Sequence, residues 1–167
     1  MNDKKLNKIK HLAIPGWWAR RGVSPAAQRR IQGVIEDSEH QHRGEIRFVA
    51  ESTLPQTALR RTHTVRARAI DVFSEFRVWD TEENTGVLLY LQLIERRIEI
   101  VADRGINKRV AQGEWDAICK RMESACAVGR IEAGVLDGLK EITALLQREF
   151  PADAVNPNEL PDAPVVR

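Results

Sequence analysis

At 167 residues, with 43% hydrophobic and 30% charged residues, the chain has the size and composition of one globular domain. It contains no run of eighteen apolar residues, so the sequence predicts that it is not an integral membrane protein. The formal net charge of +2 hides an asymmetry: residues 1–30 hold eight Lys or Arg against Asp3 alone, a balance of +7 that leaves −5 for the remainder.

Residues 1–23 form a basic N-terminal segment without a clear core pattern. Its lysines and the paired Trp17 and Trp18 suit a membrane–water interface, so residues 1–22 could bind an anionic membrane surface or a membrane-bound partner. The tryptophans could also fold back and cover part of the domain. Nucleic acid is not an expected partner, because aromatic residues are not interleaved with the basic ones as they are in proteins that bind single strands.

The apolar stretch that a secretory signal needs is interrupted here by Pro15, Gly16 and Arg20. Cys119 and Cys126 lie in a helical pattern that separates them by roughly 10 Å along the axis, too far for a disulfide. Free cysteines in a chain without such a signal favour a reducing compartment. The sequence therefore predicts a cytoplasmic protein that associates with a membrane only peripherally, if at all.

The first secure helix begins at Ser24 and Pro25, which are typical of the N-cap and the first helical position, and it is expected to end near Gly44. His40 and His42 are a weak alternative metal pair, because they point in different directions on a helix. Residues 45–51 alternate between apolar and polar and predict a strand beside the core strand.

A second helix is expected to begin within residues 59–68 and to bury Val65, Ala69, Val72, Phe73 and Phe76. Basic side chains near a helix N-terminus could hold a phosphate, although a solvated basic face is the simpler interpretation. The candidate anion-binding residues are Arg60, Arg61, His63 and Arg104.

The unbroken apolar run of residues 86–91 predicts a strand that is covered on both faces, and residues 98–102 resume with a period near two after a polar break. The two strands form a hairpin, so residues 80–85 and residues 103–105 meet at one end of the sheet. Carboxylate and amide oxygens suit a hard cation such as Ca²⁺ or Mg²⁺, although an acidic turn is more often simply solvated. The candidate metal ligands are Asp80, Glu83, Asn84 and Asp103.

Two more helices are predicted, over residues 114–126 with a glycine cap at Gly129 and from residue 131 to a stop before Pro151. Residues 151–167 contain four prolines among small and acidic residues, which predicts a disordered tail. The folded domain is expected to span residues 24–150. The order of helices and strands predicts an α/β protein, a three-layer α/β/α sandwich around a small mixed sheet.

Four segments resemble the TPM domain family, which includes a thylakoid lumen protein linked to photosystem II repair, a nematode receptor accessory protein and many bacterial proteins. The resemblance covers roughly residues 24–150. The matching segments are residues 23–28 (VSPAAQ), 79–89 (WDTEENTGVLL) and 96–100 (RRIEI), and Gly129-Arg130 with Gly134.

The resemblance implies an α/β/α sandwich, a divalent cation, often calcium, at the acidic end of the sheet, and an acid phosphatase activity without a motif that can be carried over to this chain. The chain departs from the family in two ways. Many secreted members have a signal sequence and a transmembrane helix, neither of which is expected here. A Gly-x-Gly turn in many members is Asp103-Arg104-Gly105 in this chain, so a ligand that rests on this turn could be lost or altered.

The sequence contains no complete catalytic set, and it favours a non-enzymatic interaction module that acts near a membrane and carries the divalent-cation site. The alternative is a metal-dependent phosphatase that acts on phosphate monoesters, in which Arg104 and the basic residues near position 60 would neutralise the phosphate.

Overall fold

The computed structural model describes residues 8–54, 64–153 and 157–167, and within them it contains a four-stranded mixed sheet with the strand order β3-β2-β1-β4. β1 pairs in parallel with β2 and with β4, and β2 pairs antiparallel with β3. The predicted hairpin and the predicted strand beside the core strand are therefore confirmed. The strands are β1 (Glu45–Glu51), β2 (Gly86–Gln92), β3 (Arg97–Ala102) and β4 (Val165–Val166).

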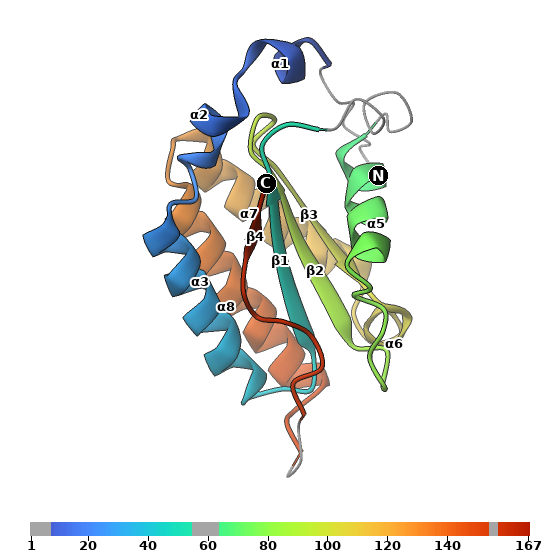
Figure 1. Cartoon of the computed structure of the whole chain (residues 1–167). Helices are drawn as coiled ribbons and strands as arrows, with labels where there is room; N and C mark the ends of the chain where they lie inside the picture. The colour runs from blue at the N-terminus through green and yellow to red at the C-terminus, as the bar shows by residue number, and fades with distance from the viewer. Residues whose placement is uncertain (1–7, 55–63, 154–156) are drawn as a thin grey trace.

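Helices cover both faces of the sheet, as the sandwich prediction requires. α3, α7 and α8 pack on one face and α5 packs on the other (Figure 1). The helices are α1 (Lys8–Ala13), α2 (Gly16–Arg20), α3 (Pro25–Glu39), α5 (Val65–Glu75), α6 (Arg104–Asn107), α7 (Gln112–Ala127) and α8 (Ile131–Glu149).

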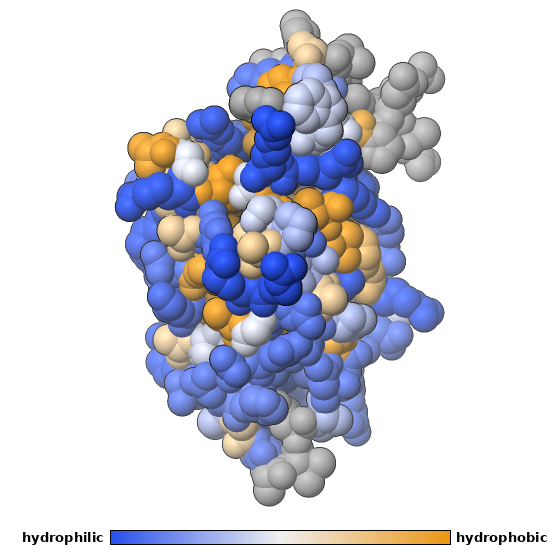
Figure 2. Space-filling model, turned by 60° about the vertical axis from the view of Figure 1, so that its left-hand side comes forward, coloured by the Kyte–Doolittle hydropathy of each residue, from blue (hydrophilic) through white to orange (hydrophobic). Residues whose placement is uncertain are grey.

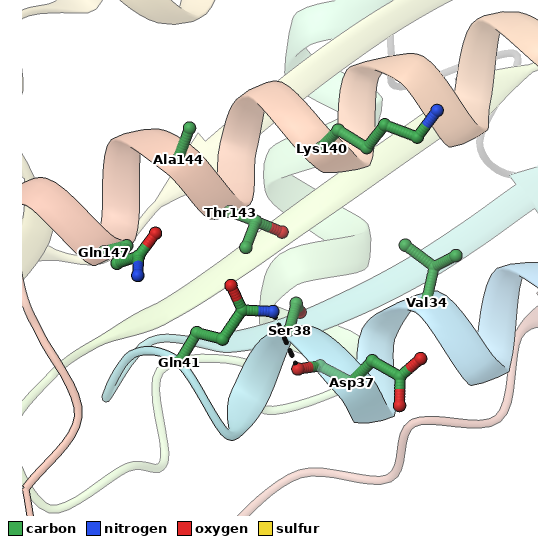
Figure 3. A pocket seen from close by; sticks show the side chains of 8 residues that line it. All are labelled: Val34, Asp37, Ser38, Gln41, Lys140, Thr143, Ala144 and Gln147. Carbon is green, nitrogen blue, oxygen red and sulfur yellow. Dashed lines mark hydrogen bonds between the residues drawn. The ribbon is translucent and has the colours of Figure 1, made fainter.

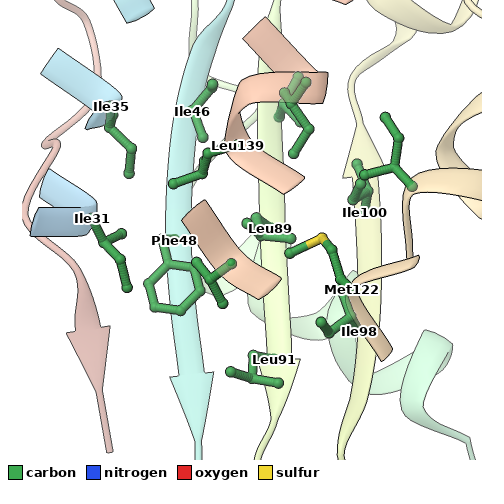
Figure 4. Close-up of a cluster of buried hydrophobic side chains, with 14 of the residues drawn as sticks. Ile31, Ile35, Ile46, Phe48, Leu89, Leu91, Ile98, Ile100, Met122 and Leu139 are labelled. Atoms are coloured by element: carbon green, nitrogen blue, oxygen red, sulfur yellow. The ribbon is translucent and has the colours of Figure 1, made fainter. Parts of the chain in front are cut away.

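β2 is buried along its whole length, and its side chains alternate between two cores. Leu89 points into the larger core with Phe48 of β1 and Leu139 of α8 (Figure 4). Leu88 and Tyr90 lie in the smaller core beneath α5. The unbroken apolar run that predicted a covered central strand is explained by these two cores, because neither face of β2 meets water.

α3 begins as predicted, with the Ser24 hydroxyl accepting the N–H of Ala27 at 3.1 Å. It ends at Glu39 and not near Gly44, so the predicted end is wrong. A side-chain carboxyl oxygen of Glu39 accepts the backbone N–H of Ile46 at 3.0 Å, which helps to turn the chain directly from the helix into β1.

The C-terminal segment differs from the predicted disordered tail. β4 pairs with Val49 and Ala50, and Arg47 donates to the carbonyl oxygens of Pro161 and Ala163. The outer edge of β1 has backbone groups that need partners, and this segment supplies them in spite of its prolines. The folded part of the chain thus includes residues 157–167, well beyond the expected boundary at residue 150.

α1 and α2 lie at the end of the sheet where β1 and β2 finish (Figure 1). His11 of α1 is buried, and its Nε2 lies 3.4 Å from the Oε1 of Glu95. A Cβ on Gly16 would lie 3.0 Å from the hydroxyl of Ser52, so the start of α2 is in close contact with the residues after β1. Among the described residues, no helix combines the length and the apolar character needed to cross a bilayer.

Candidate acidic site

We define the acidic end as the end of the sheet where β2 begins and β3 finishes, with residues 80–85 and residues 103–105. The two stretches meet there as the hairpin requires. The N–H of Gly105 donates to the carbonyl of Asn84 at 3.0 Å, and the N–H of Asp103 donates to the carbonyl of Gly86 at 2.8 Å.

Two glycines permit this close approach of backbone segments. A Cβ on Gly105 would lie 2.5 Å from the Asn84 carbonyl oxygen, and one on Gly86 would lie 1.8 Å from the carbonyl oxygen of Val78. Asn84 itself has a φ of 57°, in the left-handed region that asparagine tolerates better than most residues. The sequence around Asn84 therefore fixes how the acidic loop meets the turn after β3.

Arginines hold two of the four candidate metal ligands. One guanidinium nitrogen of Arg43 lies 2.8 Å from both carboxylate oxygens of Glu83. Asp80 is exposed, and its Oδ2 lies 3.9 Å from the Nη1 of Arg77. Both carboxylates are therefore compensated in charge without a metal ion.

The other two candidates meet at Arg104. Asn84 Oδ1 accepts a hydrogen bond from Arg104 Nε at 2.6 Å, and Asp103 Oδ1 accepts the backbone N–H of Arg104 at 2.7 Å, which caps α6. The second carboxylate oxygen of Asp103, Oδ2, is buried and has no hydrogen-bond partner in the described parts of the chain. An oxygen of this kind, buried and charged, is the feature of the site that best fits a cation.

The donor chemistry fits Ca²⁺ or Mg²⁺, which prefer carboxylate, amide and carbonyl oxygens. The geometry fits only in part. Asp103 and Asn84 share one turn, whereas Asp80 and Glu83 would have to leave their arginine partners to join them. Within the described ranges, no three His, Cys, Asp or Glu residues are grouped as a metal site would require.

Three of the predicted anion-binding residues, Arg60, Arg61 and His63, lie outside the described residues. Arg104 is exposed at the acidic end. The end of β1 and the start of α5, which flank residues 55–63, lie at the opposite end of the sheet (Figure 1). An anion site that combines all four residues stays a prediction.

His40 and His42, the alternative metal pair, differ in their exposure to solvent. His40 is exposed and His42 is fully buried. Burial lowers the pKa of His42 to about 4, against hydrogen bonds to the backbone that raise it. His42 is therefore a neutral core residue at neutral pH, and the structure gives no support to a metal ion shared with His40.

A buried ion cluster at the opposite end was not expected. Glu51, the last residue of β1, is 1% exposed and accepts two hydrogen bonds from Arg68 at 2.8 and 2.7 Å. The hydroxyl of Tyr90 and the Nε of Arg167 also donate to it, each at 2.8 Å. Burial alone would raise the pKa of Glu51, but these partners bring it below its usual value. Glutamate at the end of a buried strand was the one signal for this cluster in the sequence.

A groove of about 320 Å³ runs between α3 and α8 (Figure 3). It contains none of the predicted site residues, and within it Gln41 donates to the carbonyl of Asp37 at 3.0 Å. Its lining residues are Val34, Asp37, Ser38, Gln41, Lys140, Thr143, Ala144 and Gln147.

The family model of the TPM domain matches residues 21–145. The chain belongs to the TPM domain family. This TPM domain is similar to the BA42 protein of the psychrophilic bacterium Bizionia argentinensis, whose NMR structure is 27% identical in sequence over 86% of this chain and 94% of that one, with a TM-score of 0.75. The N-terminal domain of a protein from P. gingivalis, at 19% identity, covers 76% of this chain and 78% of that one with a TM-score of 0.62, and shows the same fold. A search of curated protein sequences finds no match.

Proposed function

We propose that this TPM domain is a non-enzymatic interaction module that binds an anionic membrane surface, or a protein held there, through α1 and α2, and that it carries a divalent-cation site at the acidic end. The observation that carries the proposal is the exposed Trp17, which is 57% accessible to solvent on a basic segment whose buried His11 lies against Glu95 in the turn between β2 and β3.

The chemistry around Trp17 suits an anionic interface. The guanidinium group of Arg21 lies 5.1 Å from the centre of the Trp17 ring, and Lys10 and Arg20 are exposed on the same segment. Tryptophan is enriched at membrane–water interfaces because its ring is amphipathic, and basic residues beside it attract anionic headgroups. In the view of Figure 2, several separate apolar spots lie between hydrophilic residues, which favours binding that depends on charge.

Flotation with vesicles tests the membrane surface. The full chain should float with vesicles that contain 30 to 40% phosphatidylserine and should stay behind with pure phosphatidylcholine, and the binding should weaken in about 0.5 M salt as charges are screened. The variant Trp17→Ala should lose most of the binding. The matched control is Trp79→Ala, because Trp79 is also exposed, at 46%, and also lies beside an arginine. Equal flotation of the two variants, or none by the wild type, would overturn the membrane proposal.

The cation site is tested by thermal unfolding with and without millimolar Ca²⁺. A ligand that binds only the folded state raises the midpoint of unfolding, so the wild type should gain stability and Asp103→Asn should gain less. Asparagine keeps the cap of α6 but removes the charge of the buried oxygen. An unchanged wild-type midpoint would remove the cation from the proposal and leave the membrane surface untouched.

We place this interaction in the cytoplasm. Cys119 and Cys126 are free thiols, as the spacing predicted. Burial raises the pKa of Cys119 to about 12 and that of Cys126 to about 11, so both are inert at neutral pH. A half-buried and a buried free thiol are compatible with a reducing compartment. Export of the full chain to an oxidising compartment in its native host would contradict this localisation.

The alternative function, metal-dependent hydrolysis of phosphate monoesters, has one observation in its favour. The buried Oδ2 of Asp103 lies next to Arg104, so a carboxylate that could hold a metal and a guanidinium group that could meet a phosphate are adjacent in the chain. Purified wild type should then hydrolyse p-nitrophenyl phosphate with Mg²⁺ or Ca²⁺, and Asp80→Ala and Asp103→Ala should both be slower. Unchanged turnover in both variants would exclude this site as the source of activity.

A further inference from the structure

Each of three side chains in the acidic loop is matched with its own arginine. Asp80 lies near Arg77, Glu83 is bound by Arg43 and Asn84 by Arg104. These arginines therefore already supply the positive charge that a metal ion would bring to the loop. The three arginines are not equivalent, however, and only one of them reaches the Asp103–Asn84 turn.

Arg43 has a structural role beyond the loop. Its Nε donates to the carbonyl of Pro151 at 3.2 Å and its Nη1 lies 3.4 Å from Asp153, so it also ties the loop to the residues after α8. Arg77 is exposed, and its 3.9 Å contact with Asp80 is a loose surface pair. In the described parts of the chain, neither arginine forms a hydrogen bond or an ion pair with Asp103 or with the amide of Asn84.

Arg104 holds the turn itself. Its Nε donates a hydrogen bond to the amide oxygen of Asn84 at 2.6 Å, and its backbone N–H donates to Oδ1 of Asp103 at 2.7 Å. The remaining Asp103 oxygen is the buried one without a hydrogen-bond partner. A metal ion that used both Asp103 Oδ2 and Asn84 Oδ1 would have to displace the Arg104 guanidinium group, which is exposed and can move into solvent.

We infer that the guanidinium group of Arg104 occupies the place of the cation at Asn84 Oδ1, and that it thereby sets the affinity of the turn for a divalent cation. This inference rests on the cation site proposed above. An arginine stays charged at every pH at which the protein is folded, so its guanidinium group competes with the metal ion across that whole range. Removing the guanidinium group frees the amide oxygen and removes a like charge that repels the metal ion.

The test is calorimetric titration of CaCl₂ into the full chain. Arg104→Gln should bind Ca²⁺ with a dissociation constant about tenfold lower than that of the wild type, since a charged hydrogen bond no longer competes. The matched control is Arg29→Gln, which removes the same charge from an exposed position on α3 and should bind as the wild type does. Adding Asp103→Asn to Arg104→Gln should abolish the gain and so assign it to this turn. Melting without metal checks that all variants are folded.

The outcomes separate this inference from the cation proposal. If the wild type binds and Arg104→Gln binds no more tightly, the inference fails and the cation proposal holds. If only Arg104→Gln binds, the inference holds and the natural chain is not a calcium protein. Absence of binding in both proteins overturns both. An equal gain in Arg29→Gln also overturns the inference, because net charge and not the position of Arg104 would then explain it.

Discussion

Arg167 Nε donates to Glu51 Oε1 at 2.8 Å, so the residue that follows β4 closes the ion cluster at the end of β1. The same guanidinium group binds both oxygens of Glu75 and lies 5.1 Å from the ring of Phe76. Its backbone N–H donates to Ala50 at 3.0 Å. Side chain and backbone together fix the C-terminal strand on the sheet edge.

Replacing Arg167 with alanine should therefore destabilise the fold. It removes charged hydrogen bonds to Glu51 and Glu75, but Glu51 keeps Arg68 and Tyr90, so the loss in free energy of unfolding should be about 1–2 kcal/mol. Urea unfolding at pH 7 measures this. Arg130→Ala, at an exposed position before α8, is the control and should change little. Equal stabilities of the two variants would show that the C-terminal segment is not fixed by Arg167.

Arg68→Ala should cost more than Arg167→Ala. Arg68 is 7% exposed, and its loss leaves the buried carboxylate of Glu51 without its bidentate partner, which typically costs about 3–5 kcal/mol. The control is Arg121→Ala, which breaks an exposed pair with Glu141 and should change the free energy of unfolding little. A loss for Arg68→Ala as small as that of the control would mean that water reaches Glu51.

The sequence predicted the centre of the fold well, because burial on both faces leaves a run such as residues 86–91 without polar interruption. It did not predict β4. Val165 and Val166 are a short apolar pair after several prolines, and what holds them is the edge of β1 and the carboxylate of Glu51, which is 116 residues from Arg167 along the chain. Local composition contains no trace of such a distant partner.

The acidic end shows the same limit. The hairpin pattern was enough to bring Asn84 and Asp103 together, because a register fixes which chain ends meet. The pattern did not reveal that Glu83 would be bound by Arg43, which precedes it by 40 residues in the sequence. Residue types suggested ligands for a cation, whereas long-range pairing decided which of them are already occupied.

Gly86→Ala should unfold the protein or destabilise it by more than about 4 kcal/mol, a loss typical of severe backbone clashes. Its Cβ would lie 1.8 Å from the carbonyl oxygen of Val78, so the loop before β2 would have to move away from the strand. Circular dichroism and thermal melting of purified protein measure the loss. Near-wild-type stability would show that the loop carrying Asp80 is not packed against β2.

Gly33→Ala is the matched glycine substitution, and it should raise the free energy of unfolding where Gly86→Ala lowers it. Gly33 lies within α3, and a Cβ there would meet nothing within 4 Å. Alanine is a better helix former than glycine, so this variant should gain about 0.5–1 kcal/mol in the free energy of unfolding. Urea unfolding beside the wild type detects it. A loss of stability would indicate that the exposed face of α3 has a contact that tolerates only glycine.

Glu39 gives the fold a pH dependence. Its carboxyl group lines a cavity of about 250 Å³ at the start of β1 with Glu45 and Asp162, among other residues. Burial, followed by the negative charges of Glu45 and Asp162, raises the pKa of Glu39 to about 9, against the hydrogen bond from Ile46 that lowers it. Glu39 is therefore protonated in the folded protein at neutral pH.

The sign of the effect follows from the raised pKa. The folded state holds a proton that the unfolded chain releases above about pH 4.5, so the contribution of Glu39 is fully present below that pH and is lost as the pH rises to about 9. Relative to Glu39→Gln, the wild type should lose up to about 1.4 kcal/mol per pH unit across this window. Urea unfolding at pH 5, 7 and 9 measures the difference, and Glu36→Gln, at an exposed position on the same helix, should give a curve parallel to that of the wild type. Parallel curves for Glu39→Gln and the wild type would mean that Glu39 is ionised in the folded state.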